Sequence, residues 1–302
     1  VRSSVGVVCG AASYTDAEAV LRDGDAAMYA AKRDPGSRVE VFQPELRREA
    51  RQQLEFDGQL KRAVERREFV PWFQPIVELE SRRVMGWESL VRWQQADGSI
   101  VMPDMFLPRA EEIGLLVEID RSLVTEACAQ VADWTIIGRP QTLSVNLSPR
   151  QFLRTDLVGW LQEMLRRTGL DPRRLQLEIP ERLLIEDRGP VRERMQQLRG
   201  LGLRLALDDF GTGYSSLGYL QSFPIDVLKI DRRFVQEGEA QVPGPICRAI
   251  VSMAQALGLD LVAEGVETEA QRDALLELGC LKGQGWLFGR AEGTRRPGVQ
   301  AG

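Results

Sequence analysis

Polar side chains that can bind metal ions or move protons recur at the ends of short apolar runs. They are Glu88, Asn146, Glu178, Asp208, Asp209, Lys229, Glu264 and Glu267. For a single run, an acid at its end has a simple explanation: the apolar strand ends where the sequence becomes polar. For six runs that end in or near such residues, one shared site is the better explanation, because the carboxyl ends of parallel barrel strands lie on one face.

An acidic cluster of this kind needs cations. Close carboxylates in a poorly hydrated mouth repel one another strongly, so they either take up protons or bind positive ions. Oxygen ligands indicate Mg²⁺ or Mn²⁺. The adjacent Asp208 and Asp209 are suited to bridge two such ions roughly 3.5–4 Å apart, which holds a phosphoryl group and activates water. Alternatively, the pair caps a helix or turn, and Lys229 either orients the water or is an ion-pair partner of the acids.

The chain contains no histidine. This excludes Ser/His/Asp and Cys/His catalysis, the iron site of two histidines and a carboxylate, and every histidine-based zinc site. Acids, lysine and hard metal ions must therefore carry out any hydrolytic chemistry.

Three further features accompany the acids. Asp209–Leu217 contains two glycines and three hydroxyl residues beside Tyr214, which indicates a tight loop over the site, although the spacing of a nucleotide-binding P-loop is missing. Arg92, beside Trp93, either packs its stem near the core or binds a substrate phosphate. Gln284 taken alone indicates an ordinary loop residue.

The bulk composition limits the other possibilities. Of 302 residues, 43% are hydrophobic, which allows a sizeable core. No apolar run reaches the roughly 18 residues of a membrane span, and the net charge of −5 leaves no footprint for duplex nucleic acid. Four cysteines without a CxxC pair favour reduced thiols in a cytoplasmic protein. Because residue 1 is Val, we expect either a piece of a longer protein, whose missing N-terminal domains could tether it to a membrane, or a chain that begins at an unusual start codon.

The pattern along the chain predicts four parts: an α/β fragment over 1–42, a linker helix over 43–67, a main domain over 68–292 and a flexible tail over 293–302. Strands are predicted at Phe69–Leu79, Val84–Trp93, Thr142–Leu147, Leu175–Ile179, Leu203–Asp208, Val227–Ile230, Asp260–Ala263 and Trp286–Phe288. Helices are predicted at Ala17–Arg33, Asp120–Trp134, Arg150–Thr168, Val191–Leu201, Ile246–Leu257 and Glu267–Leu278. Eight strands alternating with helices favour an α/β fold of the (β/α)8 barrel type over a doubly wound open sheet.

Seven motifs follow one another along the chain: Glu88-Ser-Leu-Val-Arg-Trp93, Asn146-Leu-Ser, Glu178-Ile-Pro-Glu181, Asp208-Asp-Phe-Gly-Thr-Gly213, Lys229-Ile-Asp231, Glu264-Gly-Val-Glu267 and Gln284-Gly-Trp-Leu-Phe288. In this order they resemble the EAL-domain family of cyclic di-GMP phosphodiesterases, over residues 55–292. Residues 1–42 resemble the carboxyl-terminal end of a GGDEF (diguanylate cyclase) domain, without the GGDEF signature.

The resemblance implies a modified TIM barrel whose first strand runs antiparallel to the rest, and a homodimer that hydrolyses cyclic di-GMP to linear pGpG with two Mg²⁺ or Mn²⁺ ions. It implies that the metal ligands are Glu88, Asn146, Glu178, Asp208, Asp209 and Glu264. It implies that Lys229 positions the attacking water, and that Arg92, Gln284 and Glu267 contact substrate or complete the cluster. Glu181 resembles the acid that anchors the loop after Asp209.

The chain departs from the family pattern in places. Ser89 stands in the signature triplet where alanine is usual, and Trp286 replaces a tyrosine. Pro180 replaces a threonine just before Glu181, which removes a backbone donor and restricts φ. Two other hypotheses therefore stay open: a catalytically silent cyclic di-GMP receptor, and an unrelated (β/α)8 enzyme that uses Mg²⁺ and a lysine base.

Overall fold

The structure is a computed structural model that describes residues 3–10, 14, 16–33, 39–136, 139–186, 188–211, 220–236 and 243–293. The chain divides into two compact units, residues 1–66 and residues 67–302. Most of the loop predicted after Asp209 lies outside the described residues, as do positions 294–302 of the predicted tail.

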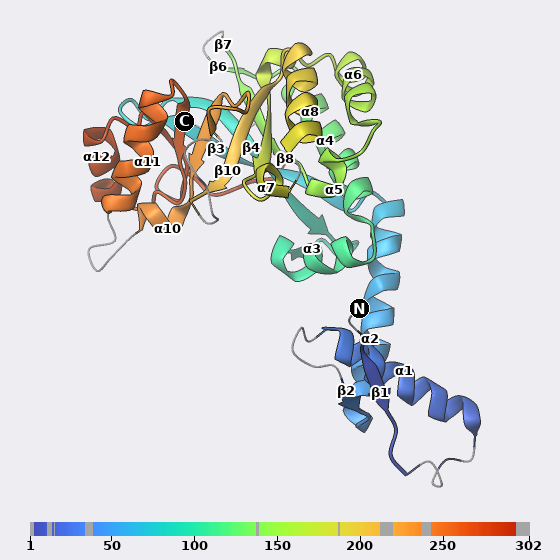
Figure 1. The fold of residues 1–302 in the computed structure, drawn as a ribbon. Coiled ribbons are helices and arrows are strands. Elements are labelled where there is room, and N and C mark those ends of the chain that lie inside the picture. Colours follow the sequence, from blue (N-terminus) through green and yellow to red (C-terminus); the bar gives the residue numbers. More distant parts are fainter. Residues whose placement is uncertain are drawn as a thin grey trace. The chain divides into compact units, whose positions relative to one another are not determined.

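The first unit is a small βαβ arrangement followed by a long helix (Figure 1). Its elements are β1 (Val5–Val7), α1 (Ala17–Arg33), β2 (Val39–Val41) and α2 (Pro44–Glu65). Strands β1 and β2 pair in parallel, and α1 spans the range predicted for it. The guanidinium of Arg47 on α2 donates to both carboxylate oxygens of the buried Asp23 on α1, at 2.8 and 2.6 Å. The helix predicted as a linker is therefore packed into this unit.

The second unit is built on a closed ring of eight strands. They are β3 (Phe69–Glu78), β4 (Val84–Gln94), β8 (Thr142–Asn146), β9 (Leu175–Pro180), β10 (Arg204–Phe210), β11 (Val227–Ile230), β12 (Asp260–Ala263) and β13 (Lys282–Gly283). From β4 through β13 the neighbours are parallel, whereas β3 runs antiparallel to both β4 and β13 and closes the ring. The predicted barrel with one antiparallel strand is confirmed, and the open-sheet alternative is wrong.

Helices and short strands cover the ring. The helices are α3 (Pro103–Glu112), α4 (Leu116–Val131), α5 (Pro149–Phe152), α6 (Leu157–Thr168), the 3-10 turn η2 (Pro172–Arg174), α7 (Leu183–Glu186), α8 (Arg188–Gly200), α10 (Arg232–Val235), α11 (Pro245–Ala256) and α12 (Glu269–Glu277). The short strands are β5 (Ile100–Val101), β6 (Thr135–Ile136) and β7 (Arg139–Pro140). No helix among the described residues combines the length and apolarity needed to cross a membrane.

The core has two layers because side chains alternate along each strand. Leu205 and Leu207 of β10 belong to the large cluster that includes buried residues of the surrounding helices. A second, separate cluster consists of Ile76, Ala206, Val227 and Val262, which come from four different strands. Since these positions alternate with the outward-packed ones, the second cluster fills the interior of the ring.

Two predicted elements are wrong in detail. Trp286–Phe288 is a turn, in which the N–H groups of Phe288 and Gly289 both donate to the carbonyl of Gly285. The last strand is instead the shorter β13, upstream of that turn. The helix predicted over Arg150–Thr168 is two helices, α5 and α6, and Ser148 caps the first of them by accepting from the N–H of Gln151.

Candidate active site

The acids and the lysine lie directly above the interior cluster at the carboxyl ends of the strands. Asp208, Lys229 and Glu264 each follow by two residues a member of that cluster: Ala206, Val227 and Val262 respectively. A step of two residues along a strand returns to the same face. The alternation that buries the apolar layer therefore also directs these three side chains into the barrel mouth.

Lys229 is the centre of the arrangement. Its side chain is 1% exposed, and Nζ lies 2.6 Å from Glu264 Oε1, 2.8 Å from Glu178 Oε2, 3.4 Å from Asp208 Oδ1 and 3.5 Å from Glu88 Oε2. The four acids come from β4, β9, β10 and the segment after β12. Their convergence on one ammonium group confirms that the predicted strand ends meet.

Two amides complete the cluster. Asn146, at the end of β8, donates from Nδ2 to Glu88 Oε1 at 3.0 Å. Gln284 donates from Nε2 to Glu88 Oε2 and, at 3.2 Å, to Glu264 Oε1. Gln284, which sequence context alone made an ordinary loop residue, is therefore held inside the site.

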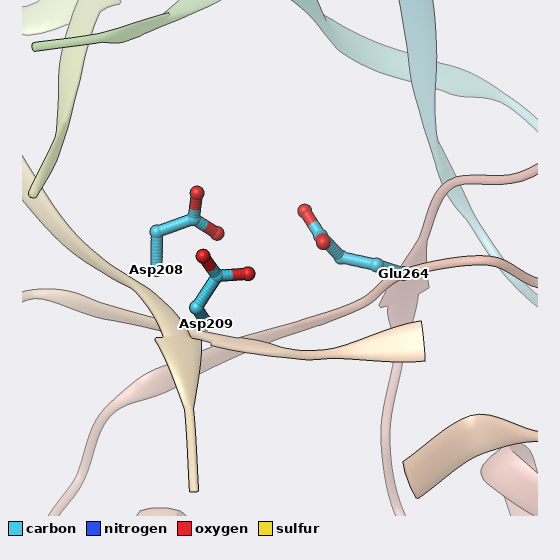
Figure 2. Close-up of side chains that lie close together, drawn as sticks. All are labelled: Asp208, Asp209 and Glu264. Atoms are coloured by element: carbon cyan, nitrogen blue, oxygen red, sulfur yellow. The ribbon is translucent and has the colours of Figure 1, made fainter. Parts of the chain in front are cut away.

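The carboxylates of Asp208 and Asp209 face the same side of the barrel mouth, although the two residues are neighbours in a strand. In regular β structure, consecutive side chains point to opposite faces. Here Asp209 has φ of +54° and the register between β10 and β11 shifts between Leu207 and Phe210, so the alternation is broken. Asp208, Asp209 and Glu264 each place an oxygen within 4.8 Å of the others, and Figure 2 shows their carboxylates facing a common space.

The electrostatics follow from burial and crowding. Burial, reinforced by Glu88, raises the pKa of Glu178 well above its usual range. Burial also raises the pKa of Glu264 to about 8, although Lys229 opposes it. For Asp209, burial and then the charge of Asp208 raise the pKa to about 6. Burial alone would lower the pKa of Lys229, but the surrounding acids raise it well above its usual range, so the ammonium form persists at neutral pH.

The donor set fits hard divalent ions. Among the described residues, the group of three carboxylates offers only oxygen ligands, which suit Mg²⁺ and Mn²⁺. Glu178 Oε1 is buried and accepts no hydrogen bond from any described residue, whereas Asp208 Oδ1, which also accepts none, lies 3.4 Å from the ammonium group of Lys229. A buried carboxylate oxygen without such a partner is costly unless a cation or a proton reaches it. Asp208, Asp209 and Glu264 would hold the ion, with Glu178 beside them.

The remaining predicted site residues are Arg92, Glu267 and Glu181. Arg92 on β4 is buried. Its guanidinium stacks 5.5 Å from the Trp72 ring and donates to the carbonyl of Val91, and its Nε has no partner among the described residues.

Glu267 is exposed, and no described contact joins its side chain to the acids. Glu181 is buried and its Oε2 accepts from the N–H of Gly211 at 2.9 Å, so it contacts the start of the loop despite the preceding Pro180.

A cavity of about 490 Å³ opens beside the acids, between β4, β8, α3 and α4. Asn146, Asp208 and Asp209 line it, as do Asp120 and Arg182. Burial raises the pKa of Asp120 to about 6, against the stabilising N–H of Ser148. The sequence prediction missed both residues: Asp120 lay within a predicted helix and Arg182 in a stretch without a pattern.

Comparisons with known proteins agree with this geometry. The family model described as EAL domain matches residues 57–291. The bifunctional diguanylate cyclase/cyclic di-GMP phosphodiesterase MucR of Pseudomonas aeruginosa is 37% identical over 96% of this chain, and cyclic di-GMP phosphodiesterase PdeR of Escherichia coli K12 is 36% identical over 95%. The chain spans 43% of the length of each of these two relatives.

Solved structures show the same fold. The structure described as PaMucR phosphodiesterase, c-di-GMP complex, is 39% identical with a TM-score of 0.74, covering 80% of this chain and 98% of that one. The EAL enzyme Bd1971, in its cAMP- and cyclic-di-GMP-bound form, is 30% identical with a TM-score of 0.73, covering 81% and 68%. The family match begins at residue 57 and leaves the prediction for residues 1–42 untested. From the match and the barrel together, the chain belongs to the EAL domain family.

Proposed function

We propose that this chain hydrolyses cyclic di-GMP to linear pGpG. The observation that carries the proposal is the convergence of Asp208, Asp209 and Glu264 on one space beside Lys229 at the carboxyl end of the barrel. Relatives whose names include cyclic di-GMP phosphodiesterase are 36–37% identical to this chain over 95–96% of its length. A solved structure of 39% identity carries cyclic di-GMP in its description.

The roles we propose follow from the contacts. Asp208, Asp209 and Glu264, with Glu88, Asn146 and Glu178, would hold two Mg²⁺ or Mn²⁺ ions. Such ions lower the pKa of bound water and offset charge on phosphoryl oxygens. Lys229, held by four acids, keeps its ammonium group at a fixed position where it can orient the attacking water and offset negative charge on the phosphate. Gln284 restrains Glu88 and Glu264, so their oxygens stay directed at the reacting centre.

A turnover assay tests the proposal. The protein is incubated with cyclic di-GMP and Mn²⁺ or Mg²⁺, and pGpG is sought by chromatography, with a chelator-treated sample as the control. We expect pGpG only with the metal. Binding of cyclic di-GMP without turnover would contradict hydrolysis and support the receptor alternative instead.

We also propose that the chain forms a homodimer in which Glu181, through its contact with Gly211, couples the loop to assembly. Light scattering after size exclusion, across protein concentrations, measures the mass in solution. A monomer at concentrations where the protein is fully active would contradict this coupling.

For the first unit, we propose descent from the carboxyl-terminal part of a GGDEF domain. The match to MucR covers 96% of the chain, whereas the EAL match starts at residue 57, so the similarity to a bifunctional relative extends into the first unit. Because the GGDEF signature is missing from the sequence, we expect no cyclic di-GMP to form from GTP, which the same chromatography checks.

A further inference from the structure

The cavity beside the acids has an unbalanced set of charges. Its acidic lining residues are Asp104, Glu111, Asp120, Asp208 and Asp209. Among the described residues that line it, Arg182 is the one basic side chain. An anionic ligand that enters this cavity therefore meets repulsion on most sides, and a single guanidinium on one.

Arg182 is placed close to the reacting centre by the β9–β10 pairing. Pro180 is the register partner of Asp208, and the N–H of Glu181 donates to the carbonyl of Asp208 at 3.3 Å. Arg182 follows immediately, in the turn before α7. Its Cα is thus two residues, or roughly 7 Å of chain, beyond a residue paired with Asp208, a span that an arginine side chain can bridge.

The guanidinium of Arg182 is available. The residue is exposed, and no described carboxylate forms an ion pair with it. The exposed arginines Arg154, Arg166 and Arg173 differ, because each is paired with an acid near it in sequence. Arg92, to which the family resemblance assigns a phosphate contact, is not among the residues that line the cavity.

A cyclic dinucleotide carries two phosphodiester groups, each with one negative charge. Ions held by Asp208, Asp209 and Glu264 would offset the charge of the phosphate that is cleaved. The second phosphate needs another positive group, and the acids of the cavity cannot supply it. Arginine binds phosphate through two parallel N–H donors, which fixes orientation as well as charge.

We propose that Arg182 binds the phosphate that is not cleaved, and thereby selects a dinucleotide with two phosphates over an ester with one. This inference rests on the proposed function. It makes Arg182 a substrate-binding residue that sets KM and selectivity, and it leaves the cleavage step to the acids and Lys229.

The test compares two substrates. Arg182→Gln, Arg182→Lys and wild type are assayed with cyclic di-GMP and with bis(4-nitrophenyl) phosphate, which has a single phosphodiester group. For Arg182→Gln we expect KM for cyclic di-GMP to rise about 10- to 100-fold, the loss typical of one charge-assisted hydrogen-bonded contact, with kcat within about twofold. Turnover of the single-phosphate ester stays unchanged. For Arg182→Lys we expect a KM for cyclic di-GMP between those of wild type and Arg182→Gln, because lysine keeps the charge but lacks the two parallel N–H donors of arginine.

A matched control is Arg173→Gln. Arg173 is exposed, lies just before the opposite end of the same strand β9 and is paired with Asp171, so its replacement leaves both substrates unaffected. The inference is overturned if Arg182→Gln keeps the wild-type KM, or if it loses activity equally on both substrates, which would indicate a structural role.

Equilibrium binding separates this inference from the proposed function. If wild type binds cyclic di-GMP without cleaving it, the proposed function fails alone, and calorimetry still requires weaker binding by Arg182→Gln with about the same fold-change. If wild type neither binds nor cleaves cyclic di-GMP, both fail together.

Discussion

The ammonium group of Lys229 lies 2.6 Å from Oε1 of Glu264, and the same Glu264 belongs to the group of three carboxylates that fits a divalent ion. Asp208 is shared in the same way, at 3.4 Å from Nζ. Lys229 and a bound metal ion would therefore draw on common ligands. This relationship would make the charge of Lys229 a determinant of both stability and metal affinity.

Replacing the lysine should show both effects. Lys229→Met leaves four acids without their shared cation, and loss of one partner from a buried ion pair costs about 3–5 kcal/mol. We expect the free energy of unfolding in chelator to fall by that order. We expect Mn²⁺ to restore more stability than it adds to wild type, because without the ammonium charge the acids bind the ion more tightly, and stabilisation by a bound ion rises with the logarithm of its affinity. Urea unfolding with and without Mn²⁺ measures both.

The control for this variant is Lys282→Met. Lys282 pairs with Asp260 at 3.1 Å in a partly exposed position, where an ion pair contributes about 0–1 kcal/mol. Equal losses in the two variants, or an unchanged response to Mn²⁺ in Lys229→Met, would contradict the shared-ligand relationship.

Asp208→Asn tests the metal assignment. The substitution keeps the size of the side chain and removes the charge that a divalent ion needs. We expect kcat to fall at least about 100-fold, which corresponds to about 2.7 kcal/mol of lost transition-state stabilisation, and the metal-induced rise in Tm to shrink. Asp273→Asn, at an exposed acid paired with Arg272 on α12, is the control. Near-normal turnover in Asp208→Asn would rule the assignment out.

The raised pKa of Asp120 predicts that the free energy of unfolding depends on pH. Its pKa in the folded protein, about 6, exceeds the ordinary value of 3.8 because of burial. The folded state therefore binds the proton more tightly than the unfolded state. The resulting stabilisation is complete below about pH 4, declines as pH rises through 6, and amounts to roughly 3 kcal/mol.

Asp120→Asn cannot ionise, and its amide oxygen can still accept from the N–H of Ser148. We expect the variant to exceed wild type in unfolding free energy at pH 8 by up to roughly 3 kcal/mol, and the gap to close towards pH 4. Urea unfolding without ligand at the two pH values measures it. A gap of the same size at both would show that ionisation of Asp120 is not its source.

Gly285 holds the turn that positions Gln284. A Cβ at residue 285 would lie 2.1 Å from the carbonyl oxygen of Val266 and 2.3 Å from its nitrogen, so the backbone must move. The same backbone segment carries the bond from the N–H of Val266 to the carbonyl of Gln284. Gly285→Ala should therefore lose about 1–3 kcal/mol or more of stability and reduce turnover further than stability explains.

The measurement for Gly285→Ala is turnover well below its melting temperature, where the protein stays folded. Gly98→Ala is the comparison, because a Cβ at residue 98 has open space around it. A variant at residue 285 with reduced stability but wild-type turnover would show that Gln284 does not depend on this turn.

Several elements could be predicted because their patterns are local. The helix at 17–33 and the strands β11 and β12 match their predicted bounds, since apolar periodicity and strand-type residues act over a few neighbours. Prediction failed at Trp286–Phe288, where an apolar run is a turn. There the carbonyl of Gly285 accepts two backbone N–H groups, and no side-chain pattern records such bonds.

Some residues of the candidate site could likewise be predicted from the sequence, and others could not. The types and order of Glu88, Glu178, Asp208, Lys229 and Glu264 could be read directly, because each lies within or near the end of an apolar run. Arg182 and Asp120 carried no such signal, because what distinguishes them is proximity to a cavity formed by distant segments.

The sequence by itself determined which side chains any hydrolytic chemistry could use: acids in or near the ends of strands and a lysine, without histidine. The tertiary structure alone decided the geometry. Ring closure through β3 brings four strand ends to one ammonium group, and the left-handed backbone at Asp209 turns two neighbouring acids towards one space. Both depend on contacts between residues far apart in the chain, whose free energy no local pattern contains.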